Sequence, residues 1–563
     1  LERLLSAFDA GDLRESARDL AWDARLTLVG LYRSRQDLSA AHGAIERLIE
    51  ELIRSGDVRR LGWAHAEQAA LHAHAFAHNL GKPHIDQAIA CFEQAPDPQG
   101  LGYTLMLEGN RRNHAGDQEA SREAFRRSLP LLRRANAAQP LCEALMFACL
   151  DAFKGALPSE AITYAIEALS NAKRAKLRLS AGRTMKVLGD IFAHGYRFDQ
   201  AVVLYTQAEA LFRRNGNTYF AHYVLYHRGH CHFDAGQLDL ALSCYEEAYR
   251  FGSQHGGKTM PGAALCSKGL IAWARGEEMT ALSQCQQAYD LLDAQENRRW
   301  KPIAGAIVGA LQASLGDSER AQRAFDGAMQ EDDGGDEIRS QMIAVYRAHG
   351  DLLDMRRCQA QGDASGAEDA LKRVVPRLLE VIRCATPGAR GWSAPIRRSY
   401  WLRFAARQLM AALPEQARVE VFQATLPTGD QPFLLIDSGF SRLRVPDGTW
   451  IDLSAHGAIR RLVKALIEAP ERRLTGDEVV AHVWPGERIV RRAAANRVYK
   501  VISQTRKAGL GDWLTNAPGT YMLDPRLEVV VFTDAPRTGA IPLDPAEPLA
   551  LPTFPKHLLS GWI

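Results

Sequence analysis

A short stretch near the C-terminal end of the chain gathers side chains suited to binding an anionic polymer. Residues 488–511 contain seven Lys or Arg and no Asp or Glu. An apolar stripe at helical spacing predicts that this stretch folds as a helix with one buried face, formed by Val498, Val501, Ile502 and Thr505. The opposite face then carries Arg497, Lys500, Gln504 and Lys507, and Asn496 and Ser503 flank them.

Such a helix face suits the major groove of duplex DNA. Arg and Lys bind guanine acceptors or phosphates, and Asn and Gln pair with adenine edges. We assign Arg497 and Gln504 to bases, because their planar groups form paired hydrogen bonds. Phosphate contacts are assigned to Arg491, Arg492, Lys500 and Lys507. The alternatives are a basic face that only meets solvent and a face that binds another protein.

The local charge balance supports a nucleic-acid partner better than the global one. The chain carries 69 basic and 66 acidic residues, a net charge of +3. Residues 440–525 alone hold 14 Lys or Arg against 9 Asp or Glu, so the rest of the chain is slightly acidic. A basic module beside a nearly neutral body is typical of proteins in which one part binds DNA.

The elements around this helix are predicted from turn and capping residues. Three short β-rich runs come first, at residues 433–436, 440–445 and 449–453. A first helix follows, capped by Ser454, and Thr475 with Glu478 forms a capping box that opens a second. The third helix runs from about residue 492 to residue 508. A hairpin of residues 514–517 and 521–523 completes the series.

This order of sheet, three helices and hairpin resembles the OmpR/PhoB-type winged-helix domain of bacterial transcription regulators. The resemblance covers roughly a sixth of the chain, in the words GTWIDLS, RRLVKALIEAPERRLTGDEVVAHVWPGE, AANRVYKVISQTRK and PGTYMLDP. It implies that the third helix enters the major groove and that the hairpin is the wing. The wing departs from the family, because Asn516 and Ala517 stand where an Arg is often found. Thr515 and Asn516 are its only polar candidates for DNA contact.

An internal repeat fills most of the remaining chain. A small residue is followed by a small one 12 positions later, a bulky one after 16 and another small one after 19. Gly189, Ala201, Tyr205 and Ala208 show this pattern. It recurs at a strict 40-residue spacing in units that start at Gly109, Cys149, Gly229, Gly269 and Gly309. Six units in one register indicate a repeat architecture.

Each unit is interpreted as a helix–turn–helix pair, in which the small residues allow close packing. The spacing of small and large residues resembles the tetratricopeptide repeat. The unit is longer than the usual repeat of that family, so either its helices or its loops are extended. Looser units extend the array over residues 1–427. The resemblance implies a solenoid whose groove binds a protein or peptide partner; the alternative is a scaffold that only spaces other modules.

Other classes of function find little support in the sequence. No run of 18 apolar residues appears, which predicts no membrane span. Nine cysteines without a Cys-x-x-Cys pattern predict buried thiols and a cytoplasmic protein. The glycines between Gly252 and Thr259 imitate a phosphate loop but follow a helix, and the histidine groups around His72 and His230 are interpreted as packing or surface residues. We expect no cofactor, no metal and no enzymatic activity.

The fold class is therefore expected to be mainly α, with a helical-repeat solenoid at residues 1–427 and a small α+β winged-helix domain at residues 428–532. Six prolines in residues 533–563 predict an extended tail. The leading hypothesis is a DNA-binding transcription regulator controlled through its repeats, with a homodimer left open. One alternative is an interaction scaffold whose winged helix binds protein. Another, kept open because the chain begins with Leu1, is the regulatory part of a larger signalling ATPase.

Overall fold

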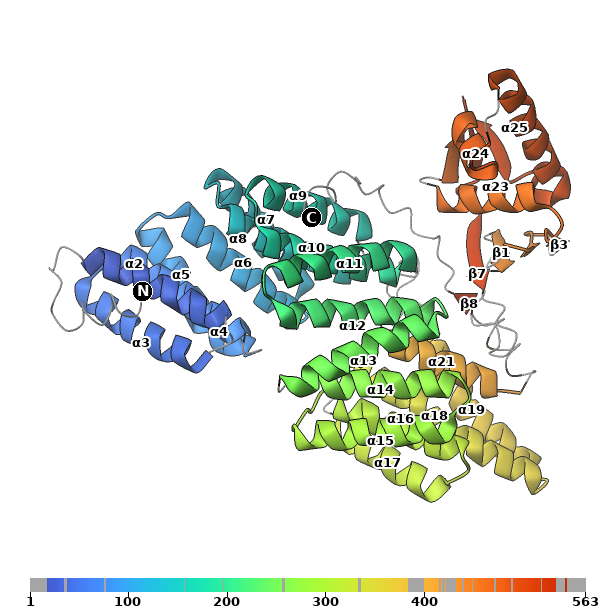
Figure 1. Cartoon of the computed structure of the whole chain (residues 1–563), viewed down its shortest axis with the longest axis horizontal. Helices are drawn as coiled ribbons and strands as arrows, with labels where there is room; N and C mark the ends of the chain where they lie inside the picture. The colour runs from blue at the N-terminus through green and yellow to red at the C-terminus, as the bar shows by residue number, and fades with distance from the viewer. Residues whose placement is uncertain are drawn as a thin grey trace. The chain divides into compact units, whose positions relative to one another are not determined.

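The structure is a computed structural model of the 563-residue chain. It describes residues 18–34, 38–74, 77–155, 157–195, 197–255, 259–332, 336–382, 399–414, 417, 421, 432–437, 440–447, 449–469, 472–487, 490–517, 519–532 and 542–543. The fold is mainly α-helical, with a tetratricopeptide-like array of helix pairs followed by small sheets and three helices (Figure 1). It divides into two compact units after Leu188.

The first unit consists of helix pairs alone. Its helices are α2 (Arg18–Ser34), α3 (Leu38–Ser55), α4 (Val58–His74), α5 (His78–Gln94), α6 (Pro98–His114), α7 (Gln118–Arg134), α8 (Ala138–Lys154) and α9 (Pro158–Arg174). The boundary between the units falls within α10 (Arg178–His194).

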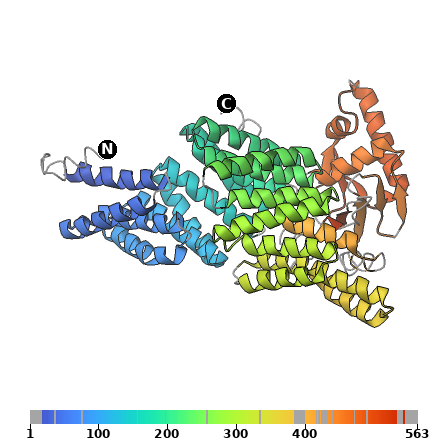
Figure 2. The same ribbon diagram turned by 60° about the horizontal axis from the view of Figure 1, so that its bottom comes forward.

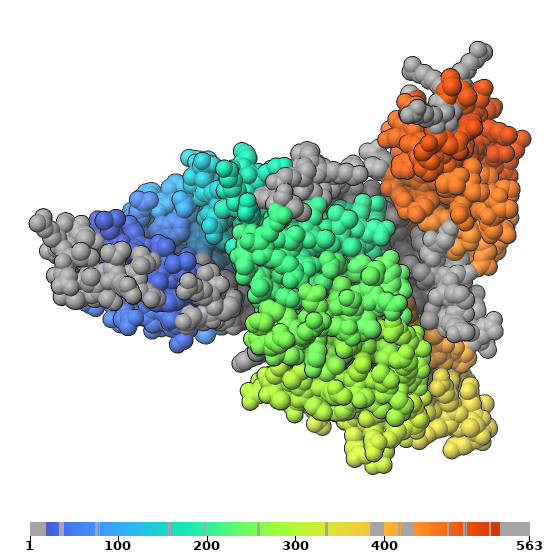
Figure 3. All heavy atoms as spheres, viewed as in Figure 1, coloured from blue at the N-terminus to red at the C-terminus, as the bar shows by residue number. Residues whose placement is uncertain are grey.

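The second unit continues the pairs and adds a further helix. Its repeat helices are α11 (Phe198–Arg214), α12 (Thr218–Asp234), α13 (Leu238–Gln254), α14 (Met260–Ala274), α15 (Glu278–Ala294), α16 (Lys301–Ser314), α17 (Ser318–Glu331), α18 (Glu337–Ala360) and α19 (Ala364–Ile382). The further helix is α21 (Tyr400–Ala412). Within this unit, α12 to α17 pack side by side into a continuous surface (Figures 2 and 3).

The repeat unit is long because its helices are long. Most repeat helices have 17 residues, and three residues connect α6 to α7 as well as α7 to α8. Helices therefore begin in equal steps along the chain, at Pro98, Gln118 and Ala138. At the first of these turns the N–H of Asp117 donates to the carbonyl oxygen of Arg112 at 3.0 Å, which closes the helix end.

The middle residue of most of these turns adopts the left-handed conformation that favours glycine. Glycine provides it at Gly116, Gly216, Gly236, Gly276 and Gly316, all with positive φ. Asn136, Lys176 and Glu296 adopt the same conformation in turns without glycine. These residues are separated by multiples of 20 positions along the chain. The connection within a helix pair and the connection between two pairs therefore have the same geometry.

The glycines at the start of the repeat pattern confirm the register. A Cβ atom on Gly189 would lie 2.5 Å from the ring of Tyr205, and one on Gly229 would lie 2.6 Å from the ring of Tyr245. Gly269 meets Cys285 in the same way. In every case the obstructing side chain belongs to the bulky position of the pattern, on the second helix of the pair. The predicted equivalence of these glycines is therefore confirmed.

The last pair is enlarged. Helix α18 has 24 residues, which moves the small and apolar positions of α19 beyond the register of the earlier pairs. Ala367 of α19 is buried where the regular spacing would place residue 361.

The C-terminal part of the second unit contains two sheets. A five-stranded sheet has the order β3-β2-β1-β7-β8, and a three-stranded sheet has the order β4-β6-β5. The strands are β1 (Phe433–Asp437), β2 (Arg442–Arg444), β3 (Trp450–Asp452), β4 (Arg473–Thr475), β5 (Leu514–Ala517), β6 (Thr520–Leu523), β7 (Glu528–Phe532) and β8 (Pro542–Leu543). The helices are α23 (Gly457–Glu468), α24 (Gly476–Val483) and α25 (Arg491–Thr505), followed by a π turn over Arg506–Leu510.

One apolar core joins these sheets and helices. Leu434 of β1, Leu462 of α23, Val479 of α24 and Ile502 of α25 are among its buried members. The predicted capping box of Thr475 and Glu478 is confirmed at the start of α24. The predicted cap at Ser454 is wrong, because α23 begins after His456 and the Ser454 N–H instead donates to Asp452.

Strand β7 has no counterpart among the elements that the sequence predicts. It pairs in parallel with β1, from Phe433 opposite Glu528 to Asp437 opposite Phe532. Edge strand β8 lies within the proline-rich tail, whose other residues are outside the described part of the chain.

Two general expectations concern the thiols and the membrane. The cysteines that the structure describes are free, and all but Cys358 are buried. Cys384 lies outside the described residues. Among the described helices, none combines the length and apolar character needed to cross a membrane.

The close contact at the repeat glycines predicts a reversed effect of Gly→Ala substitution. In a helix, alanine is normally more stable than glycine by about 1 kcal/mol. We expect Gly309→Ala to destabilise the second unit by roughly 1–3 kcal/mol, because its Cβ would lie 2.7 Å from the Phe325 ring. Urea unfolding of the two chains measures the difference.

Gly327→Ala is the matched control, since Gly327 also lies within a helix of the same pair. A Cβ there meets no described atom within 4 Å, so this variant should be as stable as the wild type or more so. Equal stability of Gly309→Ala and Gly327→Ala would contradict the packing role of the repeat glycine.

Candidate functional site

Helix α25 is fixed in the C-terminal part by one buried stripe. Val498, Val501 and Ile502 are each at most 3% exposed, and Thr505 is fully buried. The Thr505 hydroxyl donates to the Val501 carbonyl oxygen at 2.8 Å, so its polar group is satisfied within the helix. The four residues of the predicted inward stripe are therefore buried together, and the remaining sides of α25 are left for solvent or a partner.

The side chains proposed for DNA contact differ in their positions around α25. Successive residues of an α-helix turn by about 100°, which places Asn496 and Lys500 of α25 opposite the buried stripe. Lys507 lies beyond α25, in the π turn. Arg497 and Gln504 lie toward one flank and not on the opposite face, where the sequence pattern placed them. All five of these are exposed, and Ser503 is partly exposed. Arg491 and Arg492 belong to the first turn of α25, but their side chains are outside the described part of the structure.

Arg497 is held by an acidic residue that precedes α25. Its guanidinium lies 2.5 Å from the Glu487 carboxylate and 5.8 Å from the centre of the Trp484 ring. Both charged groups are about half exposed, so water weakens the ion pair. The sequence pattern did not reveal this pair, because Glu487 lies just outside the acid-free stretch.

The exposed surface of α25 also includes large apolar groups that the sequence analysis did not single out. Tyr499 is 75% exposed, and Val490, just before the helix, is 77% exposed. Tyr499 lies on the flank opposite Arg497. An aromatic ring beside basic side chains can contact a thymine methyl group, a sugar or an apolar protein surface.

The β5–β6 hairpin is attached to the end of α25 through Arg506. The Arg506 guanidinium donates to the Leu514 carbonyl oxygen and, at 2.8 Å, to the Asn516 side-chain oxygen. The Thr515 hydroxyl donates to the Met522 carbonyl oxygen at 3.3 Å. The two polar hairpin candidates, Thr515 and Asn516, are therefore bonded within the hairpin region, and the Asn516 NH₂ group is the donor left for an outside acceptor.

A second candidate site is the first-helix face of the second unit, which we define as the side formed by α12, α14, α16 and α18. Helix α21 lies against it (Figure 1). The Tyr400 hydroxyl is 2.5 Å from Ser267 Oγ of α14 and 3.2 Å from the Tyr226 hydroxyl of α12. The Trp401 ring is fully buried and 5.1 Å from the Trp300 ring.

A buried acid forms the charged centre of this contact. Asp234, the last residue of α12, has a side chain only 1% exposed. It accepts hydrogen bonds from Arg403 at 2.5 Å and from Arg407 at 3.0 Å. The partner predicted for the groove of the array would bind at this face. In this structure α21 of the same chain covers it.

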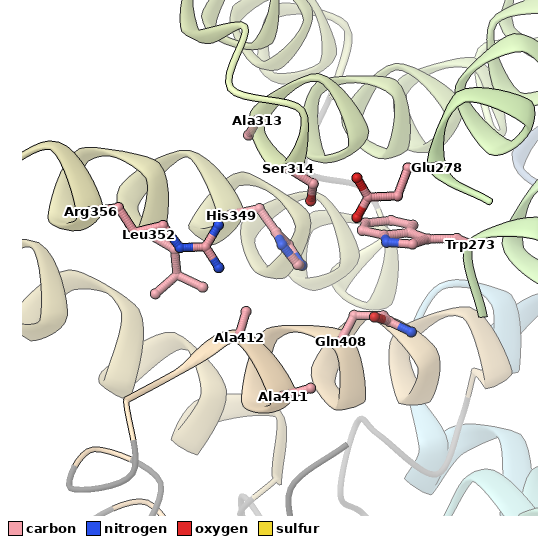
Figure 4. A pocket seen from close by; sticks show the side chains of 10 residues that line it. All are labelled: Trp273, Glu278, Ala313, Ser314, His349, Leu352, Arg356, Gln408, Ala411 and Ala412. Carbon is pink, nitrogen blue, oxygen red and sulfur yellow. The ribbon is translucent and has the colours of Figure 1, made fainter. Parts of the chain in front are cut away.

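A pocket of about 220 Å³ remains beside α21 (Figure 4). Side chains from α14, α15, α16, α18 and α21 line it, including Trp273, Glu278, His349, Arg356 and Gln408. His349 is 6% exposed, and its Nε2 has no hydrogen-bond partner. Burial, with nearby Arg356, lowers the pKa of His349 to about 3, so its ring is neutral at neutral pH.

Of the histidines considered in the sequence, His227 and His230 lie together, with ring centroids 5.4 Å apart, whereas His72 groups with histidines of neighbouring helices. In the first unit, His72 clusters with His42, His65 and His84 of α3, α4 and α5. The Nδ1 atoms of His65 and His84 are 3.1 Å apart. The side chains of His74 and His78 are outside the described residues. In the described part of the chain, no group of three or more His, Cys, Asp or Glu is arranged to hold a metal ion.

Comparison with known proteins yields only distant likenesses. Neither a protein-family model nor a curated protein sequence matches the chain. Among solved structures, the chain is similar to apo RapI, with 10% identity over 63% of this chain and 97% of that one and a TM-score of 0.48. A Rap protein complexed with competence and sporulation factor shows 12% identity over 63% and 97% of the two chains, with a TM-score of 0.44.

A third similar structure is a signal transduction ATPase with numerous domains and a tetratricopeptide repeat sensor from Pyrococcus horikoshii. It shows 14% identity over 60% of this chain and 53% of that one, with a TM-score of 0.40. At these identities and TM-scores the likenesses say nothing about function.

The histidine cluster predicts that the first unit loses stability in mild acid. Burial and the neighbouring His84 lower the pKa of His65 from 6.5 to about 4. Between these values the unfolded chain binds more protons than the folded one, so stability is complete above pH 6.5 and falls as the pH drops. We expect His65 to reduce the opening free energy of α4 and α5 by roughly 1 kcal/mol from about pH 7.5 to 5.5. Hydrogen exchange measures that free energy.

In a His65→Gln variant most of this loss should disappear, because the residue no longer titrates. His232→Gln, at a partly exposed position of α12 in the other unit, serves as the control and should leave the loss of opening free energy in α4 and α5 unchanged. The prediction fails if His65→Gln and the wild-type chain lose equal opening free energy.

Proposed function

We propose that this protein is a sequence-specific DNA-binding transcription regulator without enzymatic activity. Residues 428–532 form its winged-helix domain of OmpR/PhoB type, in which α25 enters the major groove and the β5–β6 hairpin acts as the wing. We assign residues 1–427 to the array that receives a protein or peptide signal and residues 533–563 to a proline-rich tail that follows the domain. Since its target is the chromosome, we place the protein in the bacterial cytoplasm.

The observation that carries this proposal is the composition of the exposed side of α25. Residues 488–511 contain no acid, and the basic and amide side chains surround a helix whose other side is buried. A surface that only needed solvation would tolerate acids among its bases. An exposed helix without them, held on a rigid core, suits a polyanion that also presents base edges.

The hairpin supports a phosphate-binding role. Arg506 connects the end of α25 to Leu514 and Asn516, so helix and hairpin keep a constant separation. A hairpin without its own free arginine gives weak, phosphate-directed contacts. Base specificity then rests on α25, through Asn496, Arg497 and Gln504. A selected DNA site with two half-sites would indicate that the protein binds as a homodimer.

A specific observation favours a second candidate, in which the winged helix binds protein. Tyr499 and Val490 are both at least 75% exposed, and exposed aromatic and aliphatic side chains are enriched in protein interfaces. In that case α25 would bind an acidic protein surface with an apolar centre, and the chain would serve as an interaction scaffold.

Binding to DNA over a salt series separates these candidates. On an enriched duplex and on random duplex, we expect Lys500→Ala to weaken both complexes alike and to reduce the salt slope by about one unit. Gln504→Ala should cost roughly 1–3 kcal/mol on the enriched duplex and much less on the random one. Lys464→Ala, an exposed lysine of α23, is the control.

The Arg497–Glu487 pair provides a second comparison in the same assay. Glu487→Gln removes a negative charge beside the DNA and should raise affinity, whereas Arg497→Ala should lower it. If all of these variants bind both duplexes as the wild type does, α25 is not the DNA-binding element and the scaffold hypothesis is preferred.

A further inference from the structure

We propose that the first-helix face of α12, α14, α16 and α18 is the partner-binding site of the array, and that α21 is its built-in occupant. An external partner is then a helix with two aromatic side chains and one or two arginines, placed at the same positions along the helix as they are in α21. This proposal rests on the proposed function, since it identifies where and by what chemistry the array receives its protein or peptide signal.

One side of α21 has the spacing of a helical recognition motif, and other residues of the helix, including Leu402, Ala406 and Leu409, are also buried in the core of the second unit. Tyr400, Arg403, Phe404 and Arg407 follow one another at positions i, i+3, i+4 and i+7, which form one face of a helix. Each contacts first helices. Phe404 lies 5.4 Å from the Phe233 ring and 5.6 Å from the Trp273 ring, between α12 and α14.

The polar contacts make this face selective. The hydroxyl groups of Tyr400, Tyr226 and Ser267 form a buried hydrogen-bonded triangle. The His230 ring stacks on Tyr400 with a centroid distance of 3.6 Å. An occupant without a hydroxyl group at this point would leave Tyr226 and Ser267 with fewer partners in a buried environment, which is unfavourable.

Asp234 determines the charge that an occupant must bring. The helix dipole disfavours an acid at the C-terminal end of a helix. The equivalent last residues of α6, α8 and α10 are His114, Lys154 and His194, as this rule predicts. Asp234 departs from it, and its nearly inaccessible carboxylate is compensated by arginines from α21.

When α21 leaves, Asp234 loses both arginines but becomes open to water. An occupant that covers this carboxylate again without a guanidinium or ammonium group would bury an unpaired charge, which is strongly unfavourable. The face therefore exchanges one cationic helix for another, and acidic or uncharged peptides are excluded.

The fit of α21 is incomplete at its C-terminal end. There Ala411, Ala412 and Gln408 border the pocket of about 220 Å³, toward which His349 points (Figure 4). Both His349 Nε2 and Trp401 Nε1 are buried without a hydrogen-bond partner. A partner with longer polar side chains in place of the two alanines would fill this pocket and satisfy His349. The binding free energy gained in the pocket would let an external helix compete with α21, which is favoured by its high effective concentration as part of the same chain.

The exchange would affect the proposed DNA-binding domain through the covalent chain. Helix α21 ends at Ala412, and β1 begins at Phe433. While α21 occupies the first-helix face, the connection to the domain starts at the array itself. When a partner replaces α21, this helix becomes part of the segment that links the array to the domain. The link is then longer, and the domain is held less closely to the array.

A peptide with the sequence of residues 399–413, labelled with a fluorophore, tests the proposal without any DNA. Its binding to the full-length chain is measured by anisotropy. We expect an Arg403→Ala/Arg407→Ala chain, whose own α21 no longer compensates Asp234, to bind this peptide at least about tenfold more tightly than the wild type does. The same peptide with both arginines replaced by alanine should lose this advantage.

Asp234→Asn in the double-arginine variant supplies the matched control, because it removes the charge that selects the arginines. On that chain the two peptides should bind alike. Arg407→Ala alone is a milder variant for the case in which the double variant does not fold, and it should show a smaller gain. The proposal is overturned if folded arginine variants, verified by circular dichroism, bind neither peptide or bind both equally while Asp234 is intact.

Hydrogen exchange in the wild-type chain gives an independent measurement. Amides of α21 should exchange faster than those of α16, since an exchangeable occupant opens without unfolding the array. Exchange of both helices at one common rate would make α21 a permanent part of the core. Loss of DNA binding would leave these peptide results unchanged, so failure of this proposal and failure of the proposed function are distinguishable.

Discussion

The close approach of paired helices at one glycine in most of the repeats is the constraint on which the array depends. Where Gly189 or Gly309 lies, the ring of Tyr205 or Phe325 occupies the space that a side chain would need. That contact sets the separation and register of the two helices in a pair, and each pair then presents an apolar side to the next. From α4 to α13, helices of 17 residues joined by three-residue connections repeat this geometry. Within the second unit the first helices α12, α14, α16 and α18 form one face, and that face is where α21 lies.

Much of this architecture follows from local sequence patterns, and the exceptions have physical reasons. The small and aromatic positions of the repeat, the buried stripe of α25 and the capping box at Thr475 depend on spacing within one or two helices, so the sequence predicts them. Turns at Lys176 and Glu296 carry no glycine, and their left-handed conformation is imposed by the flanking helices. Strand β7 depends on β1, which lies far earlier in the chain, and no local pattern reports such a pairing.

The candidate sites show the same division. The basic and amide residues of α25 could be named from the sequence, because their periodicity is local. The ion pair of Arg497 with Glu487 and the exposure of Tyr499 depend on how the preceding turn meets the helix. The occupation of the array by α21 could not be predicted from the sequence, since Asp234 and Arg403 are 169 residues apart. Its sequence signal is an acid at a helix end where α6, α8 and α10 have His or Lys.

The central claim is that α25 faces DNA, and photocrosslinking tests it most directly. Full-length protein would be bound to a duplex in which thymine is replaced by iodouracil, irradiated and digested for mass spectrometry. The account predicts crosslinks within residues 493–507, with Tyr499 foremost, because an exposed aromatic ring lies beside the basic side of the helix. Crosslinks confined to the helical array, or none at all under conditions where the protein binds its acidic or peptide partners, would contradict it.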